Sequence, residues 1–287
     1  MEPICDLHIH SNCSDGTMTP TELVRLAQQR GLKAVALCDH NTVAGLPEFL
    51  GAAAGSDLWA VPGIEFSTDY ENAELHILAL FVKPQHYAVI TGKMEQMLRD
   101  KEQSNRNLVA GLKNAGVPID YDEICASRPK GNINRAVLAA EMVRLGYCEN
   151  VRDAFKDWLS EKHGYYRPPK RPDALETIRF IQSIGAVSVL AHPFLSLEEE
   201  HLRVFLPLAA EAGLAAMEVY YPKFSAEQMA LAKLLAEKHG LLLSGGSDFH
   251  GANKPDIQMG TGRGNLHIPC DLLEKLADVI GEPVPWK

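Results

Sequence analysis

The sequence predicts an α/β protein whose strands form a closed or distorted seven-stranded barrel covered by helices. Seven apolar, strand-like segments alternate with amphipathic, helix-like segments along most of the 287 residues. The strand-like segments are almost continuously apolar, which is typical of parallel strands that helices cover. The G-x-G-x-x-G fingerprint of open dinucleotide-binding sheets is missing after the first of them. Seven strands without this fingerprint favour a barrel over an open nucleotide-binding sheet.

The expected strands and helices follow one another in a regular order. The strands lie at 4–9, 34–38, 58–66, 75–81, 186–191, 215–220 and 241–244, and helices between them at 19–30, 172–183, 197–212 and 226–238. The first helix has the clearest start, because Thr19 suits the N-cap, Pro20 the first helical position and Glu22 a capping box. A glycine, which often ends a helix, follows each helical segment, at Gly31, Gly185, Gly213 and Gly240.

One long region departs from this alternation. Between about residue 86 and residue 169 the apolar residues recur with helical spacing, charged residues are more frequent, and no segment is a convincing strand. We therefore expect a barrel formed by residues 1–97 and 170–287, and a helical insertion, residues 98–169, that lies over the active site. Residues 165–169 are the expected return linker.

The composition limits the classes of partner. Twenty-eight basic and 37 acidic residues give a formal charge of −9, which disfavours broad binding to duplex nucleic acid. A small phosphorylated substrate is still compatible, because bound divalent cations would invert the local field. The N-terminus does not resemble a signal peptide, no apolar run reaches membrane-spanning length, and the six cysteines are scattered. We therefore expect reduced thiols, no membrane partner and a cytoplasmic location.

Residues that bind metals recur at the ends of the expected strands. In α/β barrels the carboxyl ends of the strands converge on one face, where active sites lie. Histidine, aspartate or glutamate ends the first, second, third and fifth expected strands. Further such residues lie within the fourth strand and after the first and the seventh. Together these residues are His8, His10, Asp15, His40, Glu65, His76, His192, Asp248 and His250. We expect these nine residues to meet at one site.

The spacing and type of these residues indicate a catalytic metal site. His8 and His10 are two residues apart on a strand and so share a face, and Asp248 and His250 repeat this spacing. Imidazoles and carboxylates without thiolates suit Zn, Mn or Fe, and several carboxylates indicate a catalytic rather than a structural site. Each pair alone is common in unrelated strands and turns, but the whole set is not. Asp6 and Asp39 either orient metal-bound imidazoles or make local turn contacts. The remaining five histidines are expected at the surface.

The ordered motifs resemble those of the polymerase and histidinol phosphatase (PHP) superfamily. The matching segments are 6–11 with 14–16, 38–41, 62–65, 75–78, 191–193 and 246–250. The resemblance implies a distorted (β/α)7 barrel with a trinuclear metal site. It implies a first ion held by His8, His10, Glu65 and Asp248, a second held by the bridging Glu65 with His76 and His192, and a third held by Asp15, His40 and His250.

One subgroup of this superfamily resembles the sequence most. Many members have histidine at the position of Asp15. Aspartate at this position is typical of the enzymes that hydrolyse nucleoside 3′,5′-bisphosphates and trim 5′-phosphorylated oligonucleotides. Those enzymes carry a phosphate-binding arginine in the insertion, which Arg135 matches, whereas Asn132 stands where they often have histidine. Lys162 and Tyr165 match a further element near the return linker. The alternative for Lys162, and likewise for Lys130 and Lys170, is a solvated positive face.

The resemblance implies a phosphoesterase that uses two or three divalent ions, Mn, Fe or Zn, to activate a bridging hydroxide, with no other catalytic side chain. The expected substrates are phosphate monoesters of nucleotides, such as 3′,5′-bisphosphates, or short 5′-phosphorylated oligonucleotides. Three alternatives stay open: a phosphatase for a small metabolite such as histidinol phosphate, a non-catalytic metal-binding PHP module, and an amidohydrolase. The amidohydrolase reading lacks the lysine usually found at a barrel strand end. The sequence does not fix the metal or the oligomeric state.

Overall fold

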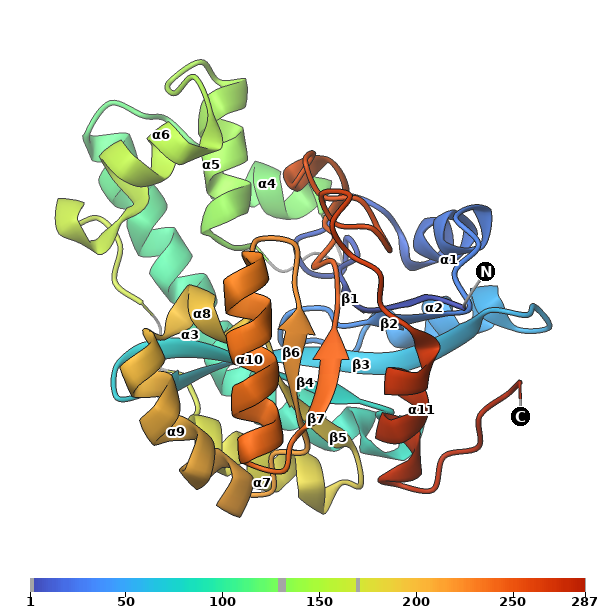
Figure 1. Cartoon of the computed structure of the whole chain (residues 1–287). Coiled ribbons are helices and arrows are strands. Elements are labelled where there is room, and N and C mark those ends of the chain that lie inside the picture. The colour runs from blue at the N-terminus through green and yellow to red at the C-terminus, as the bar shows by residue number, and fades with distance from the viewer. Residues whose placement is uncertain (1–2, 129–132, 169–170, 287) are drawn as a thin grey trace.

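A computed structural model describes residues 3–128, 133–168 and 171–286, and its centre is a seven-stranded sheet. The strands neighbour one another in chain order (Figure 1). Their bounds are β1 Cys5–Ile9, β2 Ala34–Leu37, β3 Trp59–Tyr70, β4 Ala73–Leu80, β5 Val187–Leu190, β6 Ala216–Tyr220 and β7 Leu242–Gly245. All seven overlap the expected strands. Beyond β7, the N–H of Asp248 donates to the carbonyl oxygen of His8 at 2.8 Å, and the N–H of His10 donates to that of Phe249 at 2.9 Å. These bonds bring the two edges together and nearly close the barrel.

The direction of β4 differs from the expected parallel sheet. β4 runs antiparallel to both β3 and β5, whereas the other neighbouring pairs are parallel. β3 also continues five residues past Glu65, which therefore lies within the strand and not at its end. A tight hairpin joins Tyr70 to Ala73, so the first half of β4 lies beside the second half of β3. The hairpin brings His76, near the start of β4, to the same edge as the carboxyl ends of the parallel strands.

Helices pack against the sheet, and the side chains of its strands divide between two buried clusters. β2 shows the alternation: Val35 and Leu37 join a cluster of buried side chains that includes Leu23 of the covering helix, whereas Ala34 and Ala36 join a second cluster. The covering helices are α1 Pro20–Gln29, α2 Leu46–Ala53, α7 Ala174–Ser183, α8 Pro193–Ser196, α9 Glu199–Glu211, α10 Ala226–Lys238 and α11 Cys270–Asp278. The capping box at the start of α1 is confirmed.

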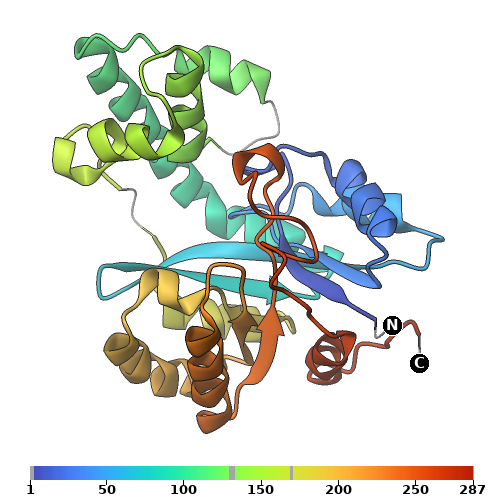
Figure 2. The ribbon, with the colours of Figure 1, turned by 45° about the horizontal axis from the view of Figure 1, so that its top comes forward.

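The described residues between β4 and β5 contain helices and no strand, as the sequence predicts. The long helix α3 Tyr87–Asn114 leads away from the sheet to α4 Tyr121–Ser127, α5 Arg135–Arg144 and α6 Val151–Ala154, followed by single turns at Phe155–Leu159 and Glu161–His163. These helices share a small apolar core of their own, which includes Leu108, Leu138 and Met142. They lie on the side toward which β6 and β7 point (Figures 1 and 2). The boundary at residues 97 and 98 falls inside α3, so the proposed domain division stays a prediction.

None of the helices in the described ranges is both long and apolar enough to cross a bilayer.

Candidate metal centre

The nine sequence-predicted residues lie together at the carboxyl ends of the parallel strands. Seven are buried and two, His40 and His76, are partly exposed. The expected surface histidines (His86, His163, His201, His239 and His267) are all partly or fully exposed. The centre is therefore a closed group of imidazoles and carboxylates with one accessible side.

Glu65 occupies the middle of the group. Its Oε2 atom lies 3.3 Å from Nε2 of His8, 3.2 Å from Nε2 of His10 and 3.1 Å from Nδ1 of His40. Its Oε1 atom lies 2.9 Å from Nδ1 of His76 and 3.1 Å from Nε2 of His192. One carboxylate thus faces two separate sets of imidazole nitrogens, which is the geometry that a bridging ligand needs.

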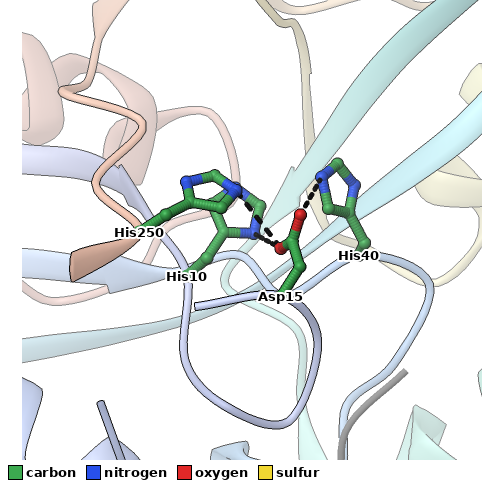
Figure 3. Close-up of side chains that lie close together, drawn as sticks. All are labelled: His10, Asp15, His40 and His250. Carbon is green, nitrogen blue, oxygen red and sulfur yellow. Dashed lines mark ion pairs between the residues drawn. The ribbon is translucent and has the colours of Figure 1, made fainter. Parts of the chain in front are cut away.

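Asp15 lies among three imidazoles, those of His10, His40 and His250 (Figure 3). Its Oδ1 atom lies 3.2 Å from Nε2 of His250 and 3.7 Å from Nδ1 of His10, and its Oδ2 atom lies 3.8 Å from Nε2 of His40. The ligand atoms of these four residues all lie within 4.8 Å of one another. The same holds for His8, His10 and Glu65, and for His40, Glu65 and His76.

Asp248 faces the cluster with one oxygen and other groups with the second. Oδ1 lies 3.3 Å from Nε2 of His10, whereas Oδ2 accepts hydrogen bonds from the Tyr221 hydroxyl at 2.7 Å and from Nζ of Lys254 at 2.6 Å. The backbone of Asp248 is held at φ 54°, a conformation that aspartate rarely adopts, and His192 is held at φ 27°. Such backbone conformations are typical of residues that the surrounding structure fixes for function.

The donor set fits divalent cations. Within the described residues, Glu65 Oε2 and His10 Nδ1 are buried and have no hydrogen-bond partner of good geometry. Buried polar atoms normally have such a partner, so these two atoms are suited to ligate a cation. Three carboxylates and six imidazoles without thiolates are the ligands that Zn, Mn and Fe accept.

The charges of the group depend strongly on one another. Burial by itself raises the pKa of Glu65, but the imidazoles of His40, His8 and His76 outweigh burial and hold this pKa well below its usual range. Burial by itself lowers the pKa of His10, but Asp248 and Glu65 raise it to about 9. For His76, Glu65 and Glu74 likewise outweigh burial and raise the pKa to about 10. The carboxylates therefore stay ionised, and these two imidazoles hold protons that a metal would replace.

Asp6 and Asp39 make the turn contacts that were one of the two expectations. Asp39 accepts hydrogen bonds from the N–H and hydroxyl of Ser11 at 2.8 and 2.6 Å and from the Ser14 hydroxyl at 2.7 Å. Asp6 accepts from the N–H and hydroxyl of Ser247 at 2.8 and 2.6 Å. Each aspartate thus fixes the loop that carries a cluster residue, Asp15 or Asp248.

Glu218, which the sequence analysis did not single out, contacts an imidazole of the cluster. Glu218 in β6 is fully buried, and its Oε1 atom lies 2.9 Å from Nδ1 of His8. Its Oε2 atom accepts the backbone N–H of His192 at 2.7 Å. Glu218, Tyr221 and Lys254 lie outside the recognised motifs, and a charged residue inside the apolar segment 215–220 was the only signal for Glu218.

Gly246 allows β1 and the segment after β7 to approach one another closely. A Cβ atom at this position would lie 2.2 Å from Cβ and 2.7 Å from the backbone nitrogen of His8. Since the backbone of β1 cannot move without shifting His8, only glycine fits here.

A cavity of about 200 Å³ joins the exposed side of the cluster to the helical insertion. His40 and His76 of the cluster line it. Three cations from separate elements line it as well: Lys101 of α3, Arg135 of α5, and Arg171, which follows the insertion. Met97, Lys101 and Asn105, spaced four residues apart, give α3 one cavity-facing side.

Arg135, one of the three sequence-predicted substrate residues, lines this cavity. The Arg135 guanidinium lies over the ring of Tyr166 at 4.0 Å, a cation–π contact that fixes its position. Lys162 is exposed and is not among the cavity-lining residues. Asn132 lies outside the described residues. The sequence did not indicate Lys101, Arg171 or Asn134. For Lys101 the reason is that helical spacing alone does not show which side of α3 meets the barrel.

Comparisons with known proteins agree with this geometry. The family model described as "PHP domain" matches residues 6–165. The chain is 31% identical over 250 residues to the 5′-3′ exoribonuclease Rnm of Salmonella typhimurium, covering 86% of this chain and 85% of the relative. It is also 31% identical over 250 residues to the 3′,5′-nucleoside bisphosphate phosphatase of Chromobacterium violaceum, covering 85% and 86%.

A solved structure resembles the whole fold. A protein of Bifidobacterium adolescentis, provisionally described as a metal-dependent phosphoesterase, superposes with a TM-score of 0.84 at 29% sequence identity. The match covers 97% of each chain and so includes both the barrel and the helices between β4 and β5.

Proposed function

Because this chain belongs to the PHP domain family and is a metal-dependent phosphoesterase, we propose that it hydrolyses phosphate monoesters of nucleotides, such as 3′,5′-bisphosphates, or short 5′-phosphorylated oligonucleotides. The observation that carries this proposal is the shared cavity. It is lined both by cluster residues, His40 and His76, and by three cations, Lys101, Arg135 and Arg171. A substrate with two anionic groups, one at the metals and one at the cations, suits this lining.

The nine clustered residues are the proposed metal ligands. We assign His8, His10, Glu65 and Asp248 to a first ion, Glu65 with His76 and His192 to a second, and Asp15, His40 and His250 to a third. Two or three ions of Mn, Fe or Zn suit these imidazole and carboxylate donors. When bound, the ions supply an activated water and neutralise the charge on the phosphoryl oxygens.

The cations of the cavity hold the remainder of the substrate. Three basic side chains and one acidic side chain, Glu74, line the cavity, so its lining carries an excess of positive charge in a chain whose formal charge is −9. The planar guanidinium of Arg135 suits two phosphate oxygens at once and is held in place by Tyr166. Lys101 of α3 is the third cation, beside Arg135 and Arg171. Together these groups bind and orient a phosphorylated nucleoside while the ester group lies near the metals.

The experiment that tests the proposal compares substrates on the Mn-loaded protein. We expect turnover of adenosine 3′,5′-bisphosphate and of a 5′-phosphorylated oligoribonucleotide to exceed that of histidinol phosphate. Equal or faster turnover of histidinol phosphate would overturn the substrate class. Absence of turnover on all three would favour a non-catalytic metal-binding module.

Two variants connect this activity to the cluster. Replacing His10→Ala or Asp248→Ala removes a proposed ligand, so turnover should disappear while the far-UV circular dichroism spectrum stays unchanged. His201→Ala, at an exposed position on α9, is the matched control and should keep full activity. Full activity in either cluster variant, or in protein stripped of metal by a chelator, would contradict the proposal.

A further inference from the structure

We propose that Glu74 is a positioning residue that connects a metal ligand, His76, to a substrate-binding arginine, Arg171. This inference rests on the proposed function, since it assigns roles to His76 and to the cavity. Glu74 lines the cavity with both of its partners. It belongs to none of the motifs that identify the metal cluster.

The two oxygens of the Glu74 carboxylate contact different partners. Oε1 lies 3.4 Å from Nε2 of His76, and Oε2 lies 2.6 Å from a terminal guanidinium nitrogen of Arg171. Glu74 and His76 are two residues apart in β4, so their side chains project from the same face of the strand. Arg171 arrives from the segment that follows the insertion. One carboxylate therefore joins the sheet, the metal cluster and the returning chain.

The contact with His76 settles which ring nitrogen is available to a metal. Nδ1 of His76 faces Glu65 at 2.9 Å, and Nε2 faces Glu74. If Nδ1 binds the metal, Nε2 must carry the hydrogen, and the Glu74 carboxylate is placed to accept it. A carboxylate in this position fixes the tautomer and the orientation of a ligand imidazole and increases its basicity.

The contact with Arg171 fixes a cation at the cavity wall. The Arg171 side chain is only 13% exposed and shares the cavity with Arg135 and Lys101. Glu74 balances its charge and holds one end of the guanidinium, which leaves the other N–H groups free to face a phosphate. The ligand imidazole and the phosphate-binding guanidinium thus take their positions from the same carboxylate.

Glutamine at position 74 is a sharp test, because it has nearly the same shape but a single acceptor oxygen. Both partners donate hydrogen, so the amide can satisfy one of them and must point its own NH2 group at the other. We expect Glu74→Gln to weaken Mn²⁺ binding about 10- to 100-fold, as other losses of such carboxylates do. Calorimetric titration of Mn²⁺ into metal-free protein measures this without substrate. Glu71→Gln, the same charge change at an exposed position of the same hairpin, should bind Mn²⁺ like the wild type.

A double-mutant cycle tests the connection itself. Arg171→Met should raise the KM for the nucleotide and, because it releases Glu74, should also weaken Mn²⁺ binding several-fold. In the Glu74→Gln background, Arg171→Met should cause no further loss of Mn²⁺ affinity. Additive losses would overturn the connection, as would Mn²⁺ affinities within twofold of the wild type in both single variants.

The Mn²⁺ titrations and the nucleotide assay test this proposal and the proposed function separately. The Mn²⁺ titrations use no substrate, so they decide the role of Glu74 even where the nucleotide assay fails. If Glu74→Gln does not fold, as judged by circular dichroism, Arg171→Met alone decides: an unchanged Mn²⁺ affinity overturns the proposal, and a several-fold loss supports it.

Discussion

The side-chain amide of Asn134 donates a hydrogen bond to the carboxylate of Asp15 at 2.8 Å, which joins the helical insertion to the metal cluster. The oxygen of the same amide accepts the backbone N–H of Val137 at 3.0 Å and so caps α5. Both the nitrogen and the oxygen of the Asn134 amide are therefore hydrogen-bonded. The next residue is Arg135, which lines the cavity. The start of α5 therefore places a cluster contact and a substrate cation side by side.

The contact between Asn134 and Asp15 predicts an effect on metal binding that is separate from stability. Asn134→Ser keeps an N-cap oxygen but is too short to reach Asp15, so the free energy of unfolding should change by less than about 1 kcal/mol. Mn²⁺ affinity should fall several-fold, because Asp15 loses the donor that orients it. Chemical denaturation and calorimetric titration measure the two quantities. A large loss of stability with unchanged Mn²⁺ affinity would mean that Asn134 serves only as a cap.

Glu218 is not one of the proposed ligands, but we expect its loss to weaken metal binding strongly. Glu218→Gln leaves one acceptor for two donors, the His8 imidazole and the His192 backbone N–H. We expect a loss of Mn²⁺ affinity of about 10- to 100-fold. Glu237→Gln on the exposed side of α10 is the control with the same charge change. Wild-type Mn²⁺ affinity in Glu218→Gln would show that the orientation of His8 does not depend on this carboxylate.

Metal affinity should rise with pH. In the metal-free protein the pKa of His10 is raised to about 9 and that of His76 to about 10, because nearby carboxylates outweigh burial. Below these values both imidazoles are protonated, and a metal must displace the protons, so affinity should increase by up to about tenfold per pH unit for each proton displaced. His40 contributes no such proton at neutral pH, since burial lowers its pKa to about 3. Titrations at several pH values, repeated in buffers of different ionisation enthalpy, count the released protons, and an affinity independent of pH would contradict this prediction.

Lys101 should affect substrate binding more than metal binding. Burial lowers the pKa of its ammonium group, and the described residues give it no ion-pair partner, so a bound phosphate is its natural counter-charge. Lys101→Met keeps the length of the side chain and should raise the KM for adenosine 3′,5′-bisphosphate about tenfold, which corresponds to the loss of one charged hydrogen bond. Lys113→Met, at an exposed position of the same helix, should leave KM unchanged. A fall in Mn²⁺ affinity with constant KM would place Lys101 in the metal centre instead.

The sequence by itself located the metal cluster. His8, Glu65 and Asp248 are distant along the chain, but each lies in or directly after an apolar segment that ends at the same edge of the barrel. Since buried strands leave a clear hydrophobic pattern, and since strand ends in a barrel converge, residue type and position predicted that the nine residues meet, although Glu65 lies within β3 and His76 reaches the site through the hairpin of β3 and β4. The helical insertion and its Arg135 followed from the same pattern and from the resemblance to known motifs.

Only the tertiary structure decided how these residues are supported. Hydrophobic periodicity reports burial but not strand direction, so the antiparallel β4 that carries Glu74 and His76 was not predicted. Glu218 is a single charged residue in an apolar segment, and Arg171 is one of several basic residues in its segment. Their roles arise from contacts with His8 and Glu74 across long stretches of chain. A metal centre needs both levels: ligands of the right chemistry, which the sequence encodes locally, and partners that orient them, which exist only once distant strands pack together.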